Sequence, residues 1–351
     1  MADLQTSKLT PSSLSALGLA GLKPVDLPLV VAYSGGADST ALLLMLAQQH
    51  PGQVQAIHIH HGLQEAADDF AAHCQVFCDR LNIPLHVTHV NAEAVSGQSP
   101  EDAARKARYT ALLAQVLHIN GALDQQIHAR AAIKKIAIAQ HADDQVETLL
   151  LALSRGAGLP GLSSMPASWE RGGVNFIRPL LGLTSFEIRT WLANQGLVAR
   201  HPGSPHIGHG WVEDPTNTDT QFTRNRIRHE LIPALEKTFP QFRQTFARSA
   251  AHAAVAQSLL VQIAAEDLAK ISNPPKIDSL QLLSLERQAN VLRFWLKSTH
   301  HVSPSTAQVS ELQSQIANCT DKGKQLHIKV ASGYVERQGE VLVYLPAARP
   351  P

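Results

Sequence analysis

Cysteine is scarce in this chain of 351 residues, which contains Cys74, Cys78 and Cys319 and has no Cys-x-x-Cys pair. Cys74 and Cys78 stand one helical turn apart, but no second pair of ligands has the spacing of a zinc site. An odd number of unpaired cysteines also argues against a disulfide framework. We therefore expect small buried thiols in a reducing compartment.

Long apolar runs and a secretory signal are missing as well. No apolar stretch reaches the roughly 18 residues that a membrane-spanning helix needs, and the opening residues, MADLQTSKLTPSSL, lack a basic start followed by an apolar core. We therefore expect a cytoplasmic protein with no membrane partner. The net charge of +1 gives no argument for nucleic acid. A basic stretch at 171–250 fits a phosphate-backbone surface and a solvated face equally well.

The Walker motif G-x-x-x-x-G-K-[ST] is also absent, but a different phosphate-binding pattern occurs at residues 30–40, VVAYSGGADST. Glycines after a strand let the backbone turn tightly and direct successive N–H groups at an anion, with a helix N-terminus behind them. Asp38 would repel a phosphate unless a divalent cation lay between them, so the pattern predicts a Mg²⁺-nucleotide with Asp38 at the metal. The alternative is a strand-to-helix turn with an Asp/Ser cap. The predicted cradle consists of Ser34, Gly35, Gly36, Ala37, Asp38 and Ser39.

The first half of the chain alternates between strand-like and helix-like segments. Such alternation predicts an α/β fold with a doubly wound parallel sheet and helices on both faces. Loops at the carboxyl ends of the strands then form the ligand site. The expected strands are 27–33, 54–61, 85–90 and 134–140, and the expected helices are 39–50, 67–82, 143–155 and one that opens with a cap at Ser99 and runs to 118.

The second half is less regular. The Gly-, Pro- and Ser-rich stretch 156–176 is interpreted as loops around the site; its formal G-x-G-x-x-G follows a helix, so it is not a dinucleotide fingerprint. We place a domain boundary near residue 240, with a catalytic domain at 1–240 and a helical linker plus a small α+β domain at 241–351. The expected elements are a strand at 176–181, helices at 185–196, 242–270 and 279–298, and a hairpin of 325–331 with 340–346.

An acidic pair, Asp144 and Glu147, follows the fourth expected strand. The two residues are three apart and therefore face the same side of the helix that begins there. Two carboxylates at a strand end can hold a metal, or can bind and deprotonate an amine. An acidic helix start that complements the helix dipole would explain Asp143 or Asp144 alone. Glu147 lies inside an apolar helix and is not explained that way, which favours a functional pair.

Two further sets of polar residues deserve notice. Arg224 and Arg228 are four apart and can present two guanidinium groups on one helix face, suited to phosphate or carboxylate. Arg105 and Arg108 form another basic patch, for which a solvated surface is equally acceptable. His58, His60 and His61 crowd one strand end, and since no metal-ligand frame accompanies them, we expect them to line a pocket.

The stretch SGGADS resembles the PP-loop signature, SGGxDS, of the ATP pyrophosphatase superfamily. Six further stretches resemble the tRNA(Ile)-lysidine synthetase family in their order and spacing, over roughly residues 28–240. The tail after 241 is similar to the helical linker and small C-terminal domain of that family. The six stretches are HIHHGLQ, EDAARKARYTAL, QHADDQVETLLLALSRGAGLPGLSSM, IRPLL, EDPTN and RNRIRHELIPAL.

This resemblance implies a ligase that uses ATP and Mg²⁺. It would adenylate the C2 carbonyl oxygen of cytidine 34 in the CAU anticodon of tRNA(Ile), with release of pyrophosphate. The ε-amine of L-lysine would then displace AMP and form lysidine, which changes codon reading from AUG to AUA. The partners implied are tRNA(Ile) and lysine, and the sequence leaves open whether the protein is a homodimer.

The resemblance also implies roles for single residues. Asp38 would act with Mg²⁺ at the leaving pyrophosphate, while Asp144 and Glu147 would bind the lysine ammonium and take its proton. Arg224 would neutralise a phosphate or orient the adenylated base. The implied substrate-binding residues are His141, Arg155, Arg105, Arg108 and Arg228. The chain departs from the family at Gln140, where a His is common, at His60, where many members have Asp, and at Gln64, where many have Arg.

Two rival functions remain. A tRNA thiolation enzyme of the same superfamily would need cysteines placed to carry sulfur or a cluster, which the three cysteines do not offer as a Cys-x-x-Cys pair. A nucleotide-gated RNA-binding protein without turnover is the other. Asp144 and Glu147 argue against it, because a simple binder has no need of carboxylates beside a polyanion.

Overall fold

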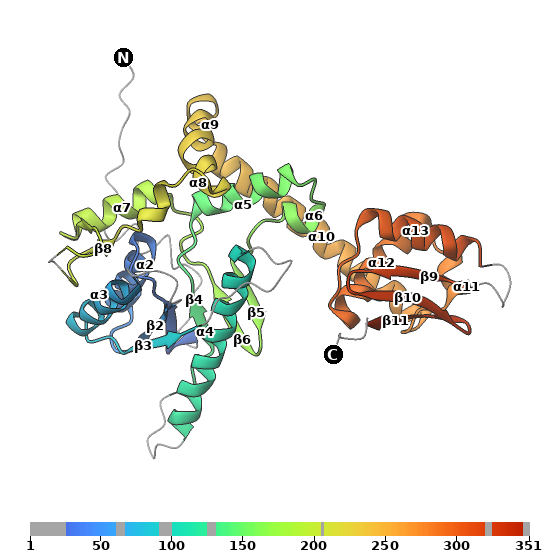
Figure 1. Ribbon diagram of the computed structural model, residues 1–351, viewed down its shortest axis with the longest axis horizontal. Coiled ribbons are helices and arrows are strands. Elements are labelled where there is room, and N and C mark those ends of the chain that lie inside the picture. Colours follow the sequence, from blue (N-terminus) through green and yellow to red (C-terminus); the bar gives the residue numbers. More distant parts are fainter. Residues whose placement is uncertain are drawn as a thin grey trace. The chain divides into compact units, whose positions relative to one another are not determined.

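The computed structural model describes residues 26–60, 67–90, 100–124, 131–204, 207–319 and 325–346. The chain divides into two compact units (Figure 1). The first comprises residues 1–157 and 164–250, and the second comprises residues 158–163 and 251–351. The predictions for His61, for Gln64 and for the helix cap at Ser99 concern positions outside the described residues.

The first unit is built on a six-stranded sheet in the order β3-β2-β1-β4-β6-β5. All neighbouring pairs are parallel except β5 with β6, so the predicted α/β fold with a parallel sheet is confirmed. The strands are β1 (Leu29–Ala32), β2 (Val54–His60), β3 (Leu85–His89), β4 (Lys135–Ala137), β5 (Ser168–Arg171) and β6 (Val174–Ile177). The main helices are α2 (Ala37–Gln49), α3 (Ala67–Arg80), α4 (Pro100–Asp124), α5 (Ala142–Ser154), α7 (Ser185–Asn194) and α9 (Ile232–Thr238).

Alternate residues of the central strands enter two different cores, as a side-chain period of two requires. Leu29 and Val31 of β1 pack on one face with apolar residues of α2, α3 and α7. Val30 of β1 and Ile57 of β2 pack on the other face against α4. Helices therefore cover both faces of the sheet, which is the doubly wound arrangement that the sequence predicts.

The strand order reverses beside β1. The chain runs from β1 outward through β2 and β3, and then returns to place β4 on the other side of β1. At such a switch point the loops that follow two adjacent parallel strands separate, and a crevice opens between them at the carboxyl edge of the sheet. Here those two loops carry SGGADS, after β1, and His141 with the start of α5, after β4.

The prediction that 156–176 forms only loops is wrong. This stretch contains the short helix α6 (Leu159–Leu162), strand β5 and the start of β6. Gly172 and Gly173 have φ of +59° and +75° and connect the two strands as a two-residue hairpin turn. Adjacent glycines with positive φ are favoured in hairpin turns whose twist matches that of the strands. Gly172 and Gly173 form this turn, whereas a glycine-rich composition alone predicts a loop.

A segment of short elements follows α7 and returns to the sheet edge. The backbone N–H of Val212 in β8 donates to the carbonyl of Gly35 (2.9 Å), which joins this segment to the cradle. Its π-helical turn η3 packs Ile227 against Val146 of α5. The elements are β7 (Ala199–Arg200), β8 (Trp211–Val212), the 3-10 turn η2 (Pro215–Thr218), α8 (Thr223–Arg226) and η3 (Ile227–Leu231).

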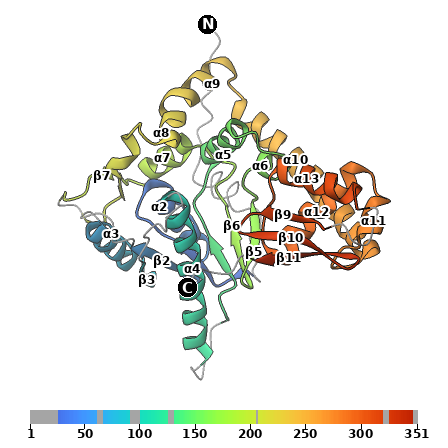
Figure 2. The ribbon, with the colours of Figure 1, turned by 45° about the vertical axis from the view of Figure 1, so that its right-hand side comes forward.

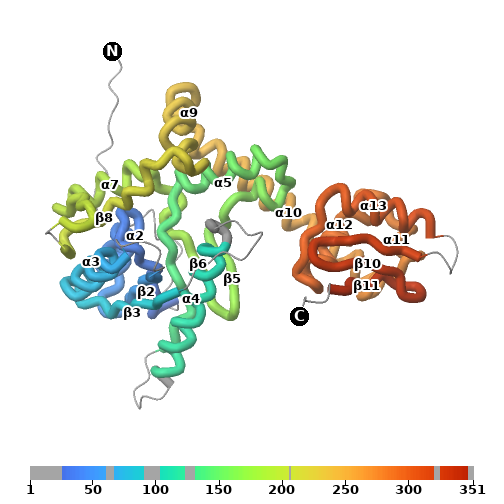
Figure 3. The backbone as a smooth tube through the Cα atoms, viewed as in Figure 1, coloured from blue at the N-terminus to red at the C-terminus, as the bar shows by residue number. Residues whose placement is uncertain are grey.

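The second unit is a small α+β domain with its own core around Trp295. Its strands pair antiparallel in the order β11-β10-β9 and lie side by side in Figure 2. The prediction that 325–331 pairs directly with 340–346 is wrong, because β10 runs between them, as the chain path in Figure 3 shows. The elements are α10 (Phe242–Ile271), which spans the border of the units, α11 (Ile277–Gln281), α12 (Leu285–His300), α13 (Thr306–Ala317), β9 (His327–Val330), β10 (Gly333–Gln338) and β11 (Val341–Pro346).

Strand β10 was missed because its sequence, GYVERQ, combines a glycine with charged and amide side chains. Only Gly333 and Val335 are fully buried, so a single apolar side chain anchors the strand to the core. The described helices offer no segment that is both long enough and apolar enough to cross a membrane.

Candidate active site

A cavity of about 970 Å³ opens in the first unit at the carboxyl ends of β1, β2 and β4. Side chains from α4, α7 and the segment 212–229 complete its wall. Four of the predicted site residues do not line the cavity, namely Gly35, Asp144, Glu147 and Arg155. Those that do line it are Ser34, Gly36, Ala37, Asp38, Ser39, Arg105, Arg108, His141, Arg224 and Arg228.

The loop after β1 is held by its own hydroxyls. The backbone N–H of Ser34 donates to Ser39 Oγ (3.2 Å), and Ser39 Oγ in turn donates to the carbonyl of Gly36 (3.1 Å). Gly36 is the N-cap of α2, and no side chain caps that helix. The first N–H groups of α2 thus reach the cavity with the positive end of the helix dipole, which suits an anion.

Gly35 occupies a position that only glycine adopts without strain, since its φ is +84°. A Cβ atom there would lie 3.0 Å from Cys74 Sγ on α3. The first glycine of the motif therefore serves the turn and the close packing of α3, while Gly36 faces the cavity.

Asp38 lies in the first turn of α2, next to His141 across the crevice. Its Oδ2 is 3.5 Å from His141 Nε2, and its buried Oδ1 accepts no hydrogen bond from any described residue. Burial alone would raise the pKa of Asp38, but the His141 ring and the charges of Arg189 and Arg228 lower it below its ordinary value. Asp38 is therefore ionised at neutral pH.

These features fit a magnesium ion that arrives with a nucleotide. Mg²⁺ is usually held by one or two carboxylates together with phosphates and water. Asp38 offers one ionised carboxylate with a free oxygen beside the cradle. Across the described ranges, no group of three or more His, Cys, Asp or Glu residues could form a protein-only metal cage.

His141 is almost fully buried at the N-cap of α5 and is surrounded by carboxylates. Its Nε2 lies 3.6 Å from Asp144 Oδ2, in addition to its contact with Asp38. Burial would lower the pKa of His141, but Asp144, Asp38 and Asp143 together raise it to about 9. The ring is thus a cation at neutral pH that joins the cradle to the start of α5.

Glu147 and Asp144 share one partner, Arg228. Arg228 Nε donates to Glu147 Oε1 (2.9 Å), and its Nη2 lies 2.7 Å from the same oxygen and 3.4 Å from Asp144 Oδ1. Arg224 Nη1 is 3.9 Å from the other oxygen, Glu147 Oε2. Glu147 is completely buried, and this burial raises its pKa despite the two arginines.

Asp143, the remaining acid at this helix start, has a structural role. Its Oδ2 accepts from the backbone N–H of Ser185 at the start of α7 (2.9 Å), and its Oδ1 accepts from Arg243 of α10. Asp143 therefore fixes α5 against two other helices, whereas Asp144 faces His141 and Arg228.

Three charged side chains that line the cavity or contact its wall escaped the sequence interpretation, namely Arg178, Arg189 and Glu213. Arg178 is buried, donates to Gln140 and to the carbonyl of Pro166 (2.6 Å), and its guanidinium lies 3.9 Å from the Trp169 ring centre. Arg189 lines the cavity and is bound by Glu213. No local spacing connects these partners, although a lone Arg in the apolar run IRPLL was a signal for Arg178.

The predicted basic residues outside this cluster differ in position. Arg105 and Arg108 of α4 are exposed on the cavity wall, and the Arg105 guanidinium lies 5.9 Å from the Tyr109 ring centre. Arg155 follows the last turn of α5, is exposed, and lies outside the cavity wall.

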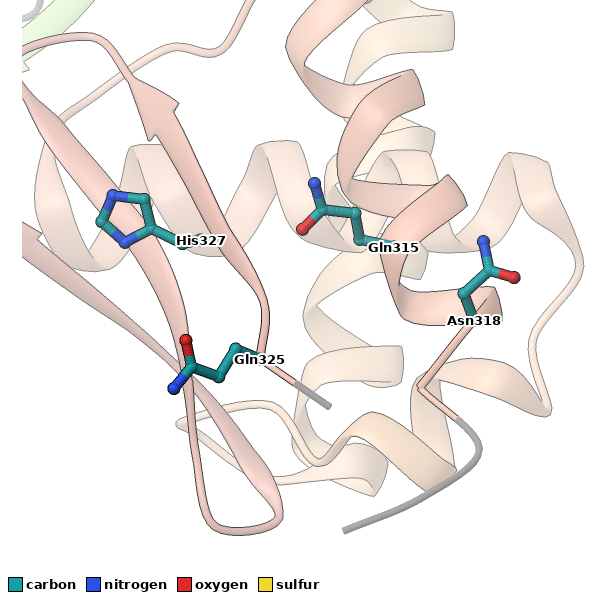
Figure 4. Close-up of a pocket in the computed structure, with 4 residues that line it drawn as sticks. All are labelled: Gln315, Asn318, Gln325 and His327. Carbon is teal, nitrogen blue, oxygen red and sulfur yellow. The ribbon is translucent and has the colours of Figure 1, made fainter. Parts of the chain in front are cut away.

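A second hollow, of about 320 Å³, lies in the second unit (Figure 4). It is lined by Gln315 and Asn318 at the end of α13 and by Gln325 and His327 on the strand side. Its wall offers amides and one imidazole, without the paired carboxylates and arginines of the larger cavity. The larger cavity in the first unit is therefore the candidate active site.

Comparison with known proteins shows the family of this chain. The profile of the PP-loop domain matches residues 22–235, and that of the TilS substrate binding domain matches residues 276–342. The chain is 55% identical, over 92% of its length, to the tRNA(Ile)-lysidine synthase of Polaromonas naphthalenivorans. The chain belongs to the tRNA(Ile)-lysidine synthase family of PP-loop proteins.

Coverage differs among these lysidine synthase relatives. The match spans 91% of the Polaromonas protein. It spans only 57% of the relative from Pseudomonas fluorescens, to which the chain is 41% identical over 76% of its own length. A solved structure of the U34-tRNA thiolase NcsA from Methanococcus maripaludis has a TM-score of 0.52 at 14% identity, over 69% of this chain and 78% of that one. That likeness shows a shared fold alone.

The cysteines and two of the histidines of this lysidine synthase family member lie as their sequence context predicts. Cys74, Cys78 and Cys319 are free and buried, and burial raises the pKa of Cys78 to about 12, so the prediction of buried thiols is confirmed. His58 and His60 line the cavity, also as predicted. His58 Nδ1 is bonded to the carbonyl of Tyr33 (2.9 Å), and His60 Nε2 to Asp68 (2.9 Å).

Proposed function

We propose that the chain ligates L-lysine to C2 of cytidine 34 in the CAU anticodon of tRNA(Ile), with ATP as a substrate and Mg²⁺ as cofactor. The observation that carries this proposal is an anion cradle on the cavity wall beside a carboxylate pair, Asp144 and the buried Glu147, which is covered by Arg228 of the same wall. The relatives are named tRNA(Ile)-lysidine synthases, which supports lysidine as the product. The protein would act in the cytoplasm, where tRNA, lysine and ATP meet.

The first step needs groups that bind the ATP phosphates and stabilise the negative charge on the leaving pyrophosphate. The N–H groups at the start of α2 and the hydroxyls of Ser34 and Ser39 would bind the ATP phosphates. Asp38 would hold Mg²⁺, which supplies neutralisation of phosphate charge when it is bound. The C2 oxygen of cytidine attacks the α-phosphorus, the bond to the β-phosphate breaks, and pyrophosphate leaves.

The second step needs a neutral amine, because only the unprotonated ε-amine of lysine is a nucleophile. Asp144 and Glu147 would bind the ammonium and accept its proton. The amine then attacks C2, and AMP leaves with the former C2 oxygen. Arg224, Arg105 and Arg108 would bind phosphates on the cavity wall, and the exposed Arg155 would contact the tRNA backbone outside it.

A labelling experiment tests the proposal. Purified protein is incubated with ATP, Mg²⁺, radiolabelled lysine and a tRNA with the CAU anticodon. We expect label in the tRNA only when ATP is present. Incorporation of labelled sulfur in place of lysine would identify a thiolation enzyme, and no transfer of either label would leave only an RNA-binding protein.

A further inference from the structure

The carboxylate pair assigned to the substrate amine is already occupied by a cation of the chain itself. Arg228 makes its closest contacts with Glu147 Oε1, at 2.7 and 2.9 Å, and reaches Asp144 Oδ1 at 3.4 Å. An ammonium would need the same oxygens. Arg228 and the substrate amine therefore compete for one position.

The contacts of Arg228 leave one carboxylate oxygen of the pair without a hydrogen bond from the described residues. Glu147 Oε2 is buried, and no described residue donates a hydrogen bond to it; Arg224 Nη1 lies 3.9 Å away. A buried carboxylate oxygen without a hydrogen bond costs free energy. Two nitrogens of Arg228 lie against the other oxygen of this carboxylate, Glu147 Oε1. An ammonium has three N–H donors and could therefore hydrogen-bond to both carboxylates.

Arg228 can also leave the pair without losing charged partners. Its side chain is about one third exposed and forms part of the cavity wall, together with Ser34, Asp38 and Ser39 of the cradle. A guanidinium binds a phosphate at least as well as a carboxylate, with the same forked geometry. Phosphates in the cavity would thus offer Arg228 a second partner on its exposed side.

The backbone around Arg228 supports such a change of partner. Arg228 is in the π-helical turn η3, which lies between the helices α8 and α9. Turns of this kind inside helices are frequent at functional sites. The N-terminal part of this segment is anchored by Asn225, whose side-chain N–H₂ donates to the carbonyls of Thr216 and Asp219 (both 2.8 Å), so a change of partner by the Arg228 side chain does not require this backbone to move.

We propose that Arg228 is an internal substitute for the substrate ammonium, and that nucleotide phosphates draw it off Asp144 and Glu147 so that lysine binds after ATP. This inference rests on the proposed function and adds an order of binding to it. In the exchange, the guanidinium passes from carboxylates to phosphate, and the lysine ammonium takes the carboxylates. The number of paired charges is the same before ATP binds and after lysine has bound, and between these two events Arg224, whose Nη1 lies 3.9 Å from Glu147 Oε2, is the cation beside Glu147.

Lysine binding, measured with and without nucleotide, tests this coupling. The full chain is titrated with radiolabelled lysine in equilibrium dialysis, alone and with saturating α,β-methylene-ATP and Mg²⁺. For the unmodified protein we expect the nucleotide to tighten lysine binding by about tenfold or more, within the usual range of coupling between sites. Equal affinity in the two conditions would overturn the proposal.

Three variants separate competition from a merely structural role. Arg228→Gln should bind lysine without nucleotide nearly as well as the unmodified protein does with it, and the coupling should fall below about twofold. Arg228→Lys keeps a competing cation and should restore the block. Arg226→Gln removes an exposed arginine of the same segment that donates to Thr223 Oγ1 and does not line the cavity, and it should keep the coupling. Weaker lysine binding by Arg228→Gln in both conditions would overturn the proposal.

The outcomes also distinguish this inference from the proposed function. Lysine binding by the nucleotide-bound protein, without any coupling, would contradict only the order of binding. No lysine binding in any condition by any of these proteins would contradict the proposed function and this inference together. Urea unfolding of each variant confirms that the compared proteins are folded.

Discussion

The cradle after β1 and the carboxylate pair on α5 are adjacent in space, but they differ in whether the protein already supplies a partner for their polar groups. At the cradle, α2 carries no side-chain cap and Asp38 Oδ1 accepts no hydrogen bond from the described residues. At the pair, Arg228 lies on both carboxylates and Arg224 is close by. The proposed phosphate site is thus preformed, while the proposed amine site is closed by the chain itself.

This difference follows from burial. Asp38 reaches the cavity, whereas Glu147 is fully buried, and a buried carboxylate without a cation is strongly destabilising. The fold must therefore provide a partner for Glu147 in the absence of substrate. The carboxylate pair with the fully buried Glu147 therefore needs a cation of the chain itself, whereas the uncapped N-terminus of α2 carries no buried charge that must be paired.

The largest effect is expected from Asp144→Asn. The amide can still accept the hydrogen bond that the backbone N–H of His141 gives to Asp144 Oδ2 (3.0 Å), but it cannot take a proton from lysine. We expect lysine transfer to tRNA to fall by about 100-fold or more, within the usual contribution of a general base. ATP binding, measured by calorimetry, should change by no more than about twofold, within the range of one lost polar contact.

The neighbouring Asp143→Asn is the matched control for that variant. It loses the buried ion pair with Arg243, so the free energy of unfolding in urea should fall by about 3 kcal/mol. Lysine transfer per folded molecule should remain. If Asp144→Asn left lysidine formation unchanged, or if Asp143→Asn abolished it in folded protein, the assignment of the two acids would be wrong.

Gly35→Ala should weaken nucleotide binding at the cradle. A Cβ at φ of +84° is strained by about 1–2 kcal/mol and meets Cys74 Sγ, so the loop must shift. We expect ATP to bind about tenfold more weakly, which corresponds to 1.4 kcal/mol. Gly52→Ala, at φ of +73° with open space around it, carries the same strain away from the cavity. An equal loss of ATP affinity in both variants would show that the cradle has no special role.

His141 joins the two regions and should give the protein an alkaline limit. Its pKa is about 9 in the folded chain against an ordinary value of 6.5, so the folded state binds a proton that the unfolded state has released. Its contribution is complete below pH 6.5 and is lost as the pH rises through 9. We expect the free energy of unfolding to fall by on the order of 3 kcal/mol across this window. Urea titrations at several pH values should show a flatter profile for His141→Gln, and an unchanged slope would contradict the cationic ring.

Arg155→Ala is expected to have the smallest effect. Arg155 lies outside the cavity, so neither ATP nor lysine affinity should change. The loss of one contact to the tRNA backbone would weaken tRNA binding about fivefold and reduce its salt dependence by about one charge. A large change in the Michaelis constant for lysine would place Arg155 at the amine site instead.

The sheet and the cradle were predictable because their signals are local. Strands at 29–32 and 54–60 are apolar runs of the right length, and SGGADS places its glycines and hydroxyls within six residues. The hairpin around Gly172 and strand β10 were missed, because charged residues and glycines in exposed strands resemble loops. Helix α13 was also not predicted, although Ser305 and Gln308 form a capping box at its start.

The partners of the site residues could not be predicted at all. Arg228 meets Glu147 across 81 positions of sequence, and Arg178 meets Gln140 across 38. Local spacing indicated two arginines and two acids, and the family resemblance implied that the acids bind a substrate amine. That the same arginine covers the acids depends on how η3 packs against α5, which no short-range pattern contains.

The most direct test of the account is the product itself. CAU-anticodon tRNA(Ile) is incubated with the purified chain, ATP, Mg²⁺ and lysine, then digested to nucleosides and analysed by mass spectrometry, while AMP and pyrophosphate are quantified. The account predicts lysidine in place of cytidine 34, with one AMP and one pyrophosphate formed for each. Unmodified cytidine 34 in the presence of folded, ATP-binding protein, or a thiolated nucleoside instead, would contradict it.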